Sequence, residues 1–317
     1  MQSSKLKLVL LFSFSFHIIS LAQKHDNNWI IGYDGGTNID FNNGYPNIYY
    51  ADRPSDMGVT NACMSDSLGN LLFYTNGCKI FNSNDEIMDN GNHLNPGFVY
   101  DEFCLSSLPT YISINGAIAL PFNDSIYYLF HQSAKIEFDD PNVYLYTDRL
   151  YYSIINMNYN NDLGRVIDKN IIVLEDTMHS GDFTSVRHAN GIDWWILAAK
   201  RETNQYFTVS LTGNGAVTVE TQSIGDSTKY ISDGAGQALF SPDGTKYVRY
   251  NPVDEIQIFD FNRTTGELSN YQKITIPGDT AFVGGAAISP NSRYLYISSQ
   301  VKFYQYDLQA TDIAASR

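Results

Sequence analysis

A recurring phrase in the sequence constrains this chain more than any other feature. Near the C-terminus, residues 236–240 lead into Ser241-Pro242-Asp243-Gly244, and residues 285–288 lead into Ser289-Pro290-Asn291-Ser292. A short aromatic segment and an alternating segment follow each turn. The step from Ser241 to Ser289 lies in the range of roughly 40–50 residues that one unit of a β repeat protein occupies.

Three looser copies of the phrase precede these two. They comprise residues 59–64, 71–75 and 79–82; residues 113–120, 126–131, 150–157 and 171–174; and residues 184–188, 194–198, 206–211 and 216–221. Each copy starts with a small-residue segment, continues with an aromatic one such as Trp194-Trp195-Ile196-Leu197, and ends in alternating segments. This order predicts short strands joined by tight turns.

Physical chemistry explains the order of the segments. A strand beside a crowded axis needs Gly and Ala, whereas a strand covered on both faces is continuously apolar. Pro242 suits the second position of a turn, and Gly244 suits a position with positive φ. We therefore predict an all-β chain, a β-propeller of four-stranded blades with about five blades visible. Antiparallel sandwiches, which also contain regularly spaced short strands, are the structural alternative.

Closure of the predicted ring is open at this point. The fifth unit lacks a fourth strand before the chain ends at Arg317. Either residues 29–33 or 37–41 supply that strand and close a five-bladed ring, or the propeller domain, residues 23–317, is incomplete and more blades follow.

The first 22 residues have the pattern of a signal peptide. Lys5 and Lys7 precede an apolar run at residues 8–19, and Ser20-Leu21-Ala22 ends in a small residue. The alternative is a membrane anchor, but the run is shorter than the roughly 20 residues that span a bilayer. We expect cleavage before Gln23, no membrane span afterwards, and a location outside the cell or on its outer surface.

The charge of the chain restricts its partners. The formal net charge is −14 at pH 7. Such a surface repels nucleic acids and anionic lipids, so we expect neither as a partner.

Three cysteines lie close together in the sequence, at Cys63, Cys78 and Cys104. Disulfides form readily in exported proteins. Cys63 and Cys78 flank a predicted hairpin and are the favoured pair, with three free cysteines as the alternative. No C-x-x-C spacing supports a zinc or redox site.

Few residues suggest a functional site. His188 ends a predicted inner strand, where it either faces the central channel or caps a turn. Tyr49 and Tyr50 lie in an Asn- and Pro-rich segment and either stack on sugar rings or pack locally. The sequence has no G-x-S-x-G elbow and no calcium or phosphate loop. We therefore predict ligand contacts at Tyr49, Tyr50 and His188, and no catalytic residue, metal or cofactor.

Several phrases resemble one protein family. They are Trp29-Ile30-Ile31-Gly32, Ile39-Asp40-Phe41, Ser65-Asp66-Ser67-Leu68-Gly69-Asn70 with Leu71 to Gly77, Val186 to Gly191, Phe240 to Gly244 and Tyr304 to Leu308. In this order they resemble the amino-terminal propeller region of secreted, gliding-associated proteins of Bacteroidota. The resemblance implies a WD40-like or lactonase-like propeller on the cell surface. Such proteins often continue into more blades and a type IX secretion sorting domain, which this sequence lacks.

These observations favour a binding or scaffold module for protein or glycan partners. The alternative is an extracellular propeller enzyme of the lactonase, lyase or glycosidase type with a site in the channel. Catalysis there requires carboxylates or a metal site near the axis, and the sequence shows no such cluster. A purely structural domain of a larger adhesin is the third hypothesis.

Overall fold

The computed structural model describes residues 24–317 except for residues 34, 107–108, 140–141, 229–235, 279–282 and 301. The predicted signal peptide, residues 1–22, lies outside the described residues. The described part contains twenty strands, a π-helical turn at Tyr100–Cys104 and a 3-10 turn at Ala314–Ser316. It is therefore an almost entirely β structure, as predicted.

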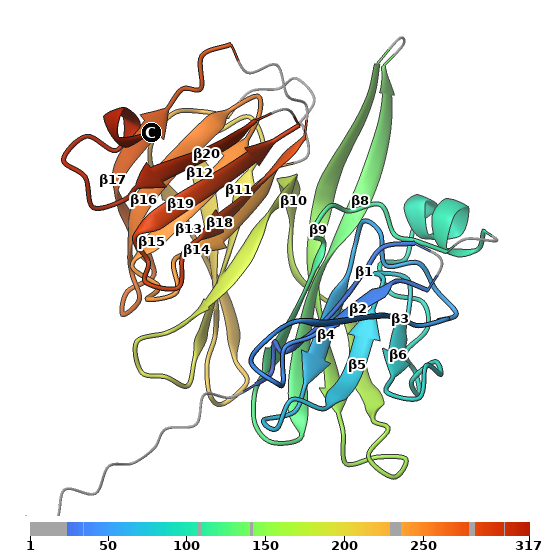
Figure 1. The fold of residues 1–317 in the computed structure, drawn as a ribbon. Coiled ribbons are helices and arrows are strands. Elements are labelled where there is room, and N and C mark those ends of the chain that lie inside the picture. The colour runs from blue at the N-terminus through green and yellow to red at the C-terminus, as the bar shows by residue number, and fades with distance from the viewer. Residues whose placement is uncertain are drawn as a thin grey trace, which may run out of the picture.

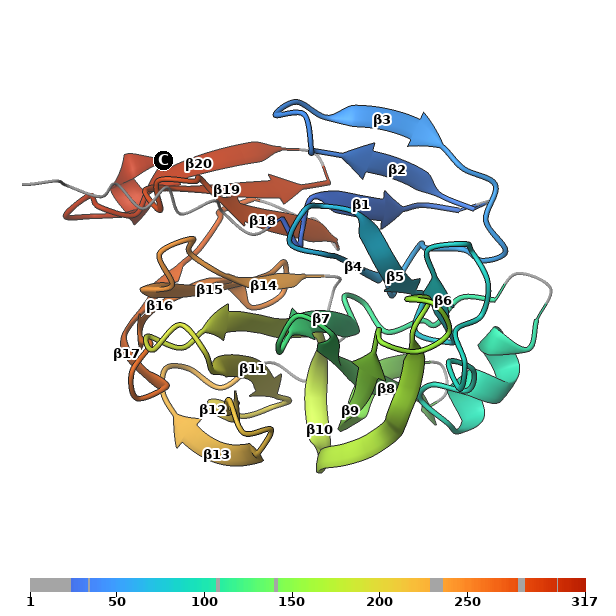
Figure 2. The same cartoon turned by 90° about the horizontal axis from the view of Figure 1, so that it is seen from below.

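The strands form successive antiparallel sheets arranged around a common axis (Figures 1 and 2). The first two sheets are β1 (Asn28–Ile31), β2 (Thr37–Asp40) and β3 (Asn47–Tyr50), and β4 (Ala62–Ser65), β5 (Leu71–Thr75) and β6 (Ile80–Asn82). The next is a seven-stranded sheet of β7 (Ala117–Pro121), β8 (Ile126–Asp139), β9 (Asn142–Asn156), β10 (Arg165–Arg187), β11 (Trp194–Lys200), β12 (Gln205–Leu211) and β13 (Val217–Ser223). The last two are β14 (Gln237–Phe240), β15 (Lys246–Asn251), β16 (Glu255–Asn262) and β17 (Glu267–Ile274), and β18 (Gly284–Ile288), β19 (Tyr294–Ser299) and β20 (Phe303–Asp307).

Strand β10 belongs to two blades. It pairs with β9 as far as Met178. It pairs with β11 at Met178 and again from Phe183 onward, with a shift of register between these two residues. Gly181 in this bend has φ +91°, and a Cβ there would lie 2.9 Å from the carbonyl oxygen of Gly236. Glycine thus permits both the backbone conformation and the close approach. The seven-stranded sheet is therefore two four-stranded blades that share strand β10. The sequence predicted two separate strands in place of this shared one.

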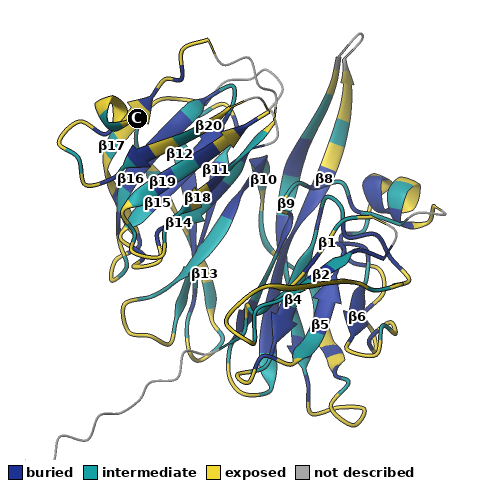
Figure 3. Ribbon diagram, viewed as in Figure 1, coloured by how far each residue is buried: buried dark blue, intermediate teal, exposed yellow. Residues whose placement is uncertain are grey.

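The core lies between neighbouring sheets (Figure 3). Tyr127 and Tyr128 on β8 point to opposite sides, one into the cluster shared with β5 and the other into the cluster shared with β11 and β12. Trp194 and Trp195 on β11 likewise point to opposite sides, Trp194 into the cluster shared with β8 and Trp195 into the cluster shared with β15 and β16. Because each aromatic second strand is covered by a sheet on both sides, the fold is a β-propeller, and the prediction is confirmed.

The recurring turn has the predicted geometry. Gly244 has φ +71°, and Ser292 at the matching position of the next copy has φ +58°. The Asp243 carboxylate accepts hydrogen bonds from the Ser241 hydroxyl at 2.6 Å and the Thr245 amide at 3.0 Å. The backbone N–H of Asp243 donates a hydrogen bond to Ser292 Oγ at 3.0 Å, and this bond joins the turns of two neighbouring blades.

The N-terminal strands differ from the prediction. In one of the two alternatives for closure, residues 29–33 or 37–41 supply the fourth strand of the last blade, but β1 pairs with β2 and β2 with β3 in a separate sheet. Ile30 on β1 packs with Met57, Tyr74 and Phe81, which attaches this sheet to the β4–β6 sheet. Counting the seven-stranded sheet as two blades, the five sheets of the described residues therefore form six blades around the axis.

Strands β8 and β9 continue beyond the neighbouring strands as an arm, which Figure 1 shows projecting from the ring. Their register runs without interruption from Ala134↔Thr147 to Asp139↔Asn142. The arm was not predicted as strand.

The disulfide prediction is wrong. The bond joins Cys78 to Cys104, and Cys63 is free. Cys63 lies on β4 opposite Tyr74, with its Sγ 2.7 Å from the carbonyl oxygen of Asn28 on β1. Cys78 lies beyond the end of β5, where the loop that carries Cys104 folds back over it. The turn after β5 thus places Cys78 away from Cys63.

Candidate binding sites

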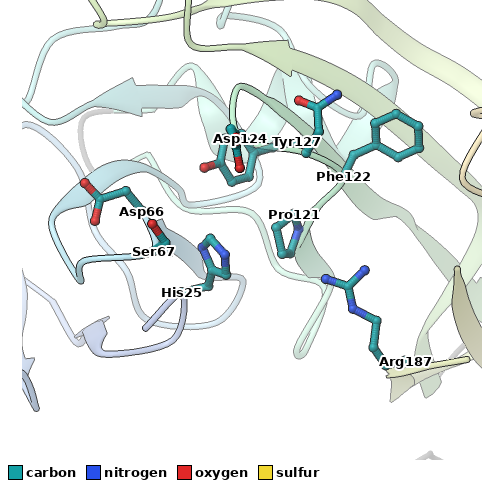
Figure 4. A pocket seen from close by; sticks show the side chains of 9 residues that line it. His25, Asp66, Ser67, Pro121, Phe122, Asp124, Tyr127 and Arg187 are labelled. Carbon is teal, nitrogen blue, oxygen red and sulfur yellow. The ribbon is translucent and has the colours of Figure 1, made fainter. Parts of the chain in front are cut away.

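A pocket of about 150 Å³, which we call the face pocket, lies at the ends of the inner strands. Turns and strand ends from three successive blades form it: the β4–β5 turn, the β7–β8 turn and the end of β10. Its lining consists of His25, Asp66, Ser67, Pro121, Phe122, Asn123, Asp124, Tyr127 and Arg187. Figure 4 shows His25, Asp66 and Ser67 on one side of Pro121 and Arg187 on the other.

The turn after β4 fixes an anionic group at one side. Asp66 Oδ1 accepts hydrogen bonds from the backbone N–H groups of Leu68 at 2.8 Å and Asn70 at 2.9 Å. Partial burial opposes ionisation, but hydrogen bonds from Asn70, Leu68 and Gly69 outweigh it and lower the pKa of Asp66. The carboxylate is therefore ionised at neutral pH.

His25 lies beside this turn. Its Nδ1 is 2.7 Å from the carbonyl oxygen of Ser65. A carbonyl oxygen only accepts hydrogen bonds, so Nδ1 carries a proton and donates it here. This bond orients the ring and leaves Nε2 for other contacts.

The opposite side of the pocket holds a cation. Arg187 at the end of β10 donates from Nη1 to the Ile192 carbonyl at 2.8 Å, and its Cζ lies 4.0 Å from the centre of the Trp194 ring. Burial lowers the pKa of Arg187, yet guanidinium groups stay protonated in proteins. Trp194 in turn donates from Nε1 to the Pro121 carbonyl at 3.1 Å. The cation is thus held in a defined position.

Tyr127 and Asp124 complete the pocket. The Tyr127 ring meets Phe73 edge-on at 5.6 Å between centroids. Burial, followed by the charges of Asp66 and Asp124, raises the pKa of Tyr127 to about 12, so its hydroxyl is neutral and can donate. Asp124 is exposed, and its side chain makes no hydrogen bond or ion pair with the described residues. A rigid pocket with carboxylates and a fixed cation suits recognition of a polar group with complementary charges.

A second pocket of about 200 Å³, which we call the axial pocket, lies at the other ends of the inner strands. It is lined by residues of β7, β10 and β14 together with the segments before β4 and β7: Asn61, Asn115, Ala117, Ile118, Phe183, Thr184, Ser185, Gln237 and Ala238. Among these residues, no side chain carries a formal charge.

His188 lies just after β10, in the turn to β11. Its Nδ1 accepts a hydrogen bond from the Asn190 backbone N–H at 3.0 Å, and its Nε2 donates to the Thr264 carbonyl at 3.1 Å. The ring packs against Trp195. Nδ1 thus caps the β10–β11 turn, in agreement with the turn-capping alternative, while Nε2 joins this turn to the neighbouring blade.

Tyr49 and Tyr50 are exposed on β3, by 45% and 63%. They are consecutive strand residues, so their side chains point to opposite faces of the sheet. Tyr49 is paired with Asn38 and Tyr50 with Thr37. The structure therefore does not bring the two rings to one surface, and neither lines the face pocket or the axial pocket.

The buried charges near the axis are ion-paired. Arg249 contacts Asp182 through Nε and Asp254 Oδ2 through Nη2, the latter at 3.1 Å. Within the described ranges, no group of three or more His, Cys, Asp or Glu residues is arranged to hold a metal ion. In that same part of the chain, no helix has both the length and the apolar character to cross a membrane.

Asp66, Asp124 and Arg187 were not predicted as ligand contacts. The sequence signal was present, because Asp66 and Asp124 lie in recurring turns at equivalent ends of inner strands. Turn chemistry alone accounts equally well for Asp at such positions.

Comparisons with known proteins give distant likenesses of fold. No family model matches the sequence, and no curated protein matches it. A candidate 6-phosphogluconolactonase from Bacteroides fragilis is 15% identical, covering 92% of this chain and 77% of its own, with a TM-score of 0.42. A candidate 6-phosphogluconolactonase from Bacteroides uniformis is 14% identical, with coverages of 88% and 76% and a TM-score of 0.46. The β-propeller domain of Cps50 (Swd1) from Myceliophteria thermophila is 11% identical, with coverages of 91% and 98% and a TM-score of 0.40. The fold assignment rests on the sheet topology rather than on these likenesses.

Proposed function

We propose that this chain is a secreted or cell-surface binding module that recognises a protein or glycan partner through the face pocket. The observation that carries the proposal is the arrangement of charge: Arg187 lies on one side of the pocket and Asp66 on the other, each held by its own hydrogen bonds. Preorganised groups of this kind reduce the entropic cost of binding.

The size of the pocket limits what enters it. Its volume of about 150 Å³ is below the roughly 300–1,000 Å³ of typical small-molecule sites. A single end group of a larger partner fits this space better than a whole ligand. Carboxylates of the partner pair with Arg187, and its ammonium or hydroxyl groups pair with Asp66 and Asp124.

The test is binding to a glycan array and a peptide library, followed by affinity measurements with pocket variants. Asp124→Asn removes the charge of a carboxylate that has no hydrogen bond or ion pair with the described residues. Tyr127→Phe removes a hydroxyl group and keeps the buried ring. We expect each to weaken binding by about ten- to a hundredfold, since a charge-assisted hydrogen bond contributes roughly 1.5–3 kcal/mol.

Asp162→Asn is the matched control, because Asp162 is exposed in the β9–β10 connection and has positive φ, which Asn tolerates. It should leave binding unchanged. A partner that binds wild type, Asp124→Asn and Tyr127→Phe equally well would contradict the face pocket as the site.

The proposal includes export. Lys5, Lys7 and the small residue Ala22 support cleavage of a signal peptide, and the resemblance to secreted gliding-associated proteins supports a location outside the cytoplasm. Expression of the gene in its own cells, with N-terminal sequencing of the mature chain, tests this. A mature start at Gln23 outside the cytoplasm is expected, and an intact N-terminus inside the cell would contradict it.

A further inference from the structure

We infer that the axial pocket is a second ligand site, distinct from the face pocket, and that it takes a single uncharged sugar residue. The two pockets lie at opposite ends of the same inner strands. The axial pocket is lined by the start of β7, the start of the second part of β10 and the start of β14. The face pocket is bordered by the ends of β7 and β10.

The side chains around the axial pocket supply uncharged hydrogen-bonding groups. Gln237 Oε1 accepts from the Ala286 N–H at 3.0 Å, which fixes the amide and leaves its Nε2 as a donor. Asn61 donates from Nδ2 to the Met57 carbonyl at 3.2 Å, which leaves its Oδ1 as an acceptor. Thr184 and Ser185 both border the pocket, although as consecutive residues of β10 their side chains lie on opposite faces of the sheet, and neither hydroxyl makes a hydrogen bond with the described residues. Donors and acceptors therefore meet from several blades.

The backbone adds to this set. β7 is the last strand of its sheet and β14 the first of its own, so each has a neighbour on one side only. The free edge of such a strand presents unpaired N–H and C=O groups. Because these strands line the pocket, their edges offer fixed donors and acceptors to a ligand.

The chemistry of the lining selects the ligand. Hydroxyls both donate and accept, and so match amide and hydroxyl side chains. A sugar ring also has apolar C–H atoms, and Ala117, Ile118 and Ala238 add apolar atoms from β7 and β14 to the lining. Charged ligands find no opposite charge in this lining, and anions are repelled by the net charge of −14. A volume of about 200 Å³ limits the occupant to one small residue.

The experiment is saturation-transfer NMR and calorimetry with a panel of neutral monosaccharides and their methyl glycosides, using the whole mature chain. Thr184→Val replaces the hydroxyl with a methyl group of similar shape, and Ser185→Ala is the second variant. Each should weaken binding of the best sugar by about three- to tenfold, the usual effect of one lost neutral hydrogen bond. Thr221→Val, on exposed β13, is the matched control and should leave the affinity unchanged.

Denaturant unfolding shows whether each variant is folded, and a folded variant that binds as wild type overturns the assignment. Absence of binding by every neutral sugar at millimolar concentration overturns it as well, as does preference for a charged sugar or a peptide amide. Asp124→Asn separates the two sites: it should not affect sugar binding at the axis even if it abolishes binding at the face pocket.

Discussion

The guanidinium group of Arg249 on β15 forms a buried ion pair with Asp182, which lies in the bend of β10. Both side chains are fully inaccessible to solvent, and Asp254 contacts the same guanidinium. The pair joins two neighbouring blades at the position where β10 passes from one blade to the next. Removal of one partner leaves an uncompensated buried charge on the other.

Replacement of Arg249 should therefore destabilise the protein strongly. We expect Arg249→Met to lower the free energy of unfolding by about 3–5 kcal/mol. Arg149→Met is the control, because Arg149 pairs with Glu175 at the surface, where an ion pair contributes about 1 kcal/mol or less. Urea denaturation of both variants measures the difference. Equal effects of the two substitutions would show that the buried pair is not a structural link between blades.

The Cys78–Cys104 disulfide closes a loop with a sequence separation of 26. In the chain-entropy model, a crosslink of this length stabilises a protein by about 3–4 kcal/mol. We expect the double variant Cys78→Ser/Cys104→Ser to lose stability of that order, and Cys63→Ser to keep the crosslink. Peptide mapping under non-reducing conditions identifies the linked pair, and a peptide that contains Cys63 crosslinked to Cys78 would contradict the structure.

Stability should fall in mildly acidic solution because of His131. The ring is fully buried, with Nδ1 2.6 Å from Asn95 Oδ1 and Nε2 2.9 Å from Ser153 Oγ. Burial lowers its pKa from 6.5 to about 3. Between these values the unfolded chain binds a proton that the folded chain does not, so stability is complete above pH 6.5 and decreases below it.

The expected slope from this group approaches about 1.4 kcal/mol per pH unit well below pH 6.5. Denaturant unfolding at several pH values from 7 down to 5 measures it, a window above the usual pKa of carboxylates. His131→Gln should be less stable at every pH but should show a flatter dependence. An unchanged slope in this variant would assign the acid sensitivity to other groups.

Strand β3 should promote self-association at high concentration. It is an edge strand whose four residues, Asn47–Tyr50, are all exposed and carry no charge. Such edges pair with other strands unless a charge or proline blocks them. We expect Ile48→Lys to reduce self-association, measured by sedimentation velocity, without changing the free energy of unfolding by more than about 0.5 kcal/mol.

Ile192→Lys is the control for this prediction. Ile192 is also exposed, by 61%, but it lies in the turn between β10 and β11 and not on an edge strand. It should leave self-association as in the wild type. If both substitutions reduce self-association equally, a general effect of added charge, rather than the open edge, is responsible.

The blades were predictable because their constraints are local. Small residues at the axis, as in Gly285-Ala286-Ala287, and turns such as Ser241 to Gly244 are fixed by the geometry of each unit. The same turns occur where the sequence placed them. Pairing between distant segments was not predictable in this way, because the β1–β3 strands have the same composition whether they complete the last blade or form their own sheet.

The candidate sites were harder to predict for a related reason. Asp66 stabilises a turn through its hydrogen bonds and contributes its charge to the face pocket. Only the turn has a recognisable sequence pattern. Cys104 approaches Cys78 because a long loop folds back, which no spacing rule gives. His188 was placed correctly at the end of an inner strand, but its hydrogen bonds with Asn190 and Thr264 appear only in three dimensions.

An NMR chemical-shift map with a captured partner tests the face pocket most directly. The account predicts that the largest changes fall on the backbone amides of Ser67, Asp124 and Arg187, which come from three different blades and meet only in that pocket. Changes confined to the β8–β9 arm or to the outer strands, with these three amides unmoved, would contradict it.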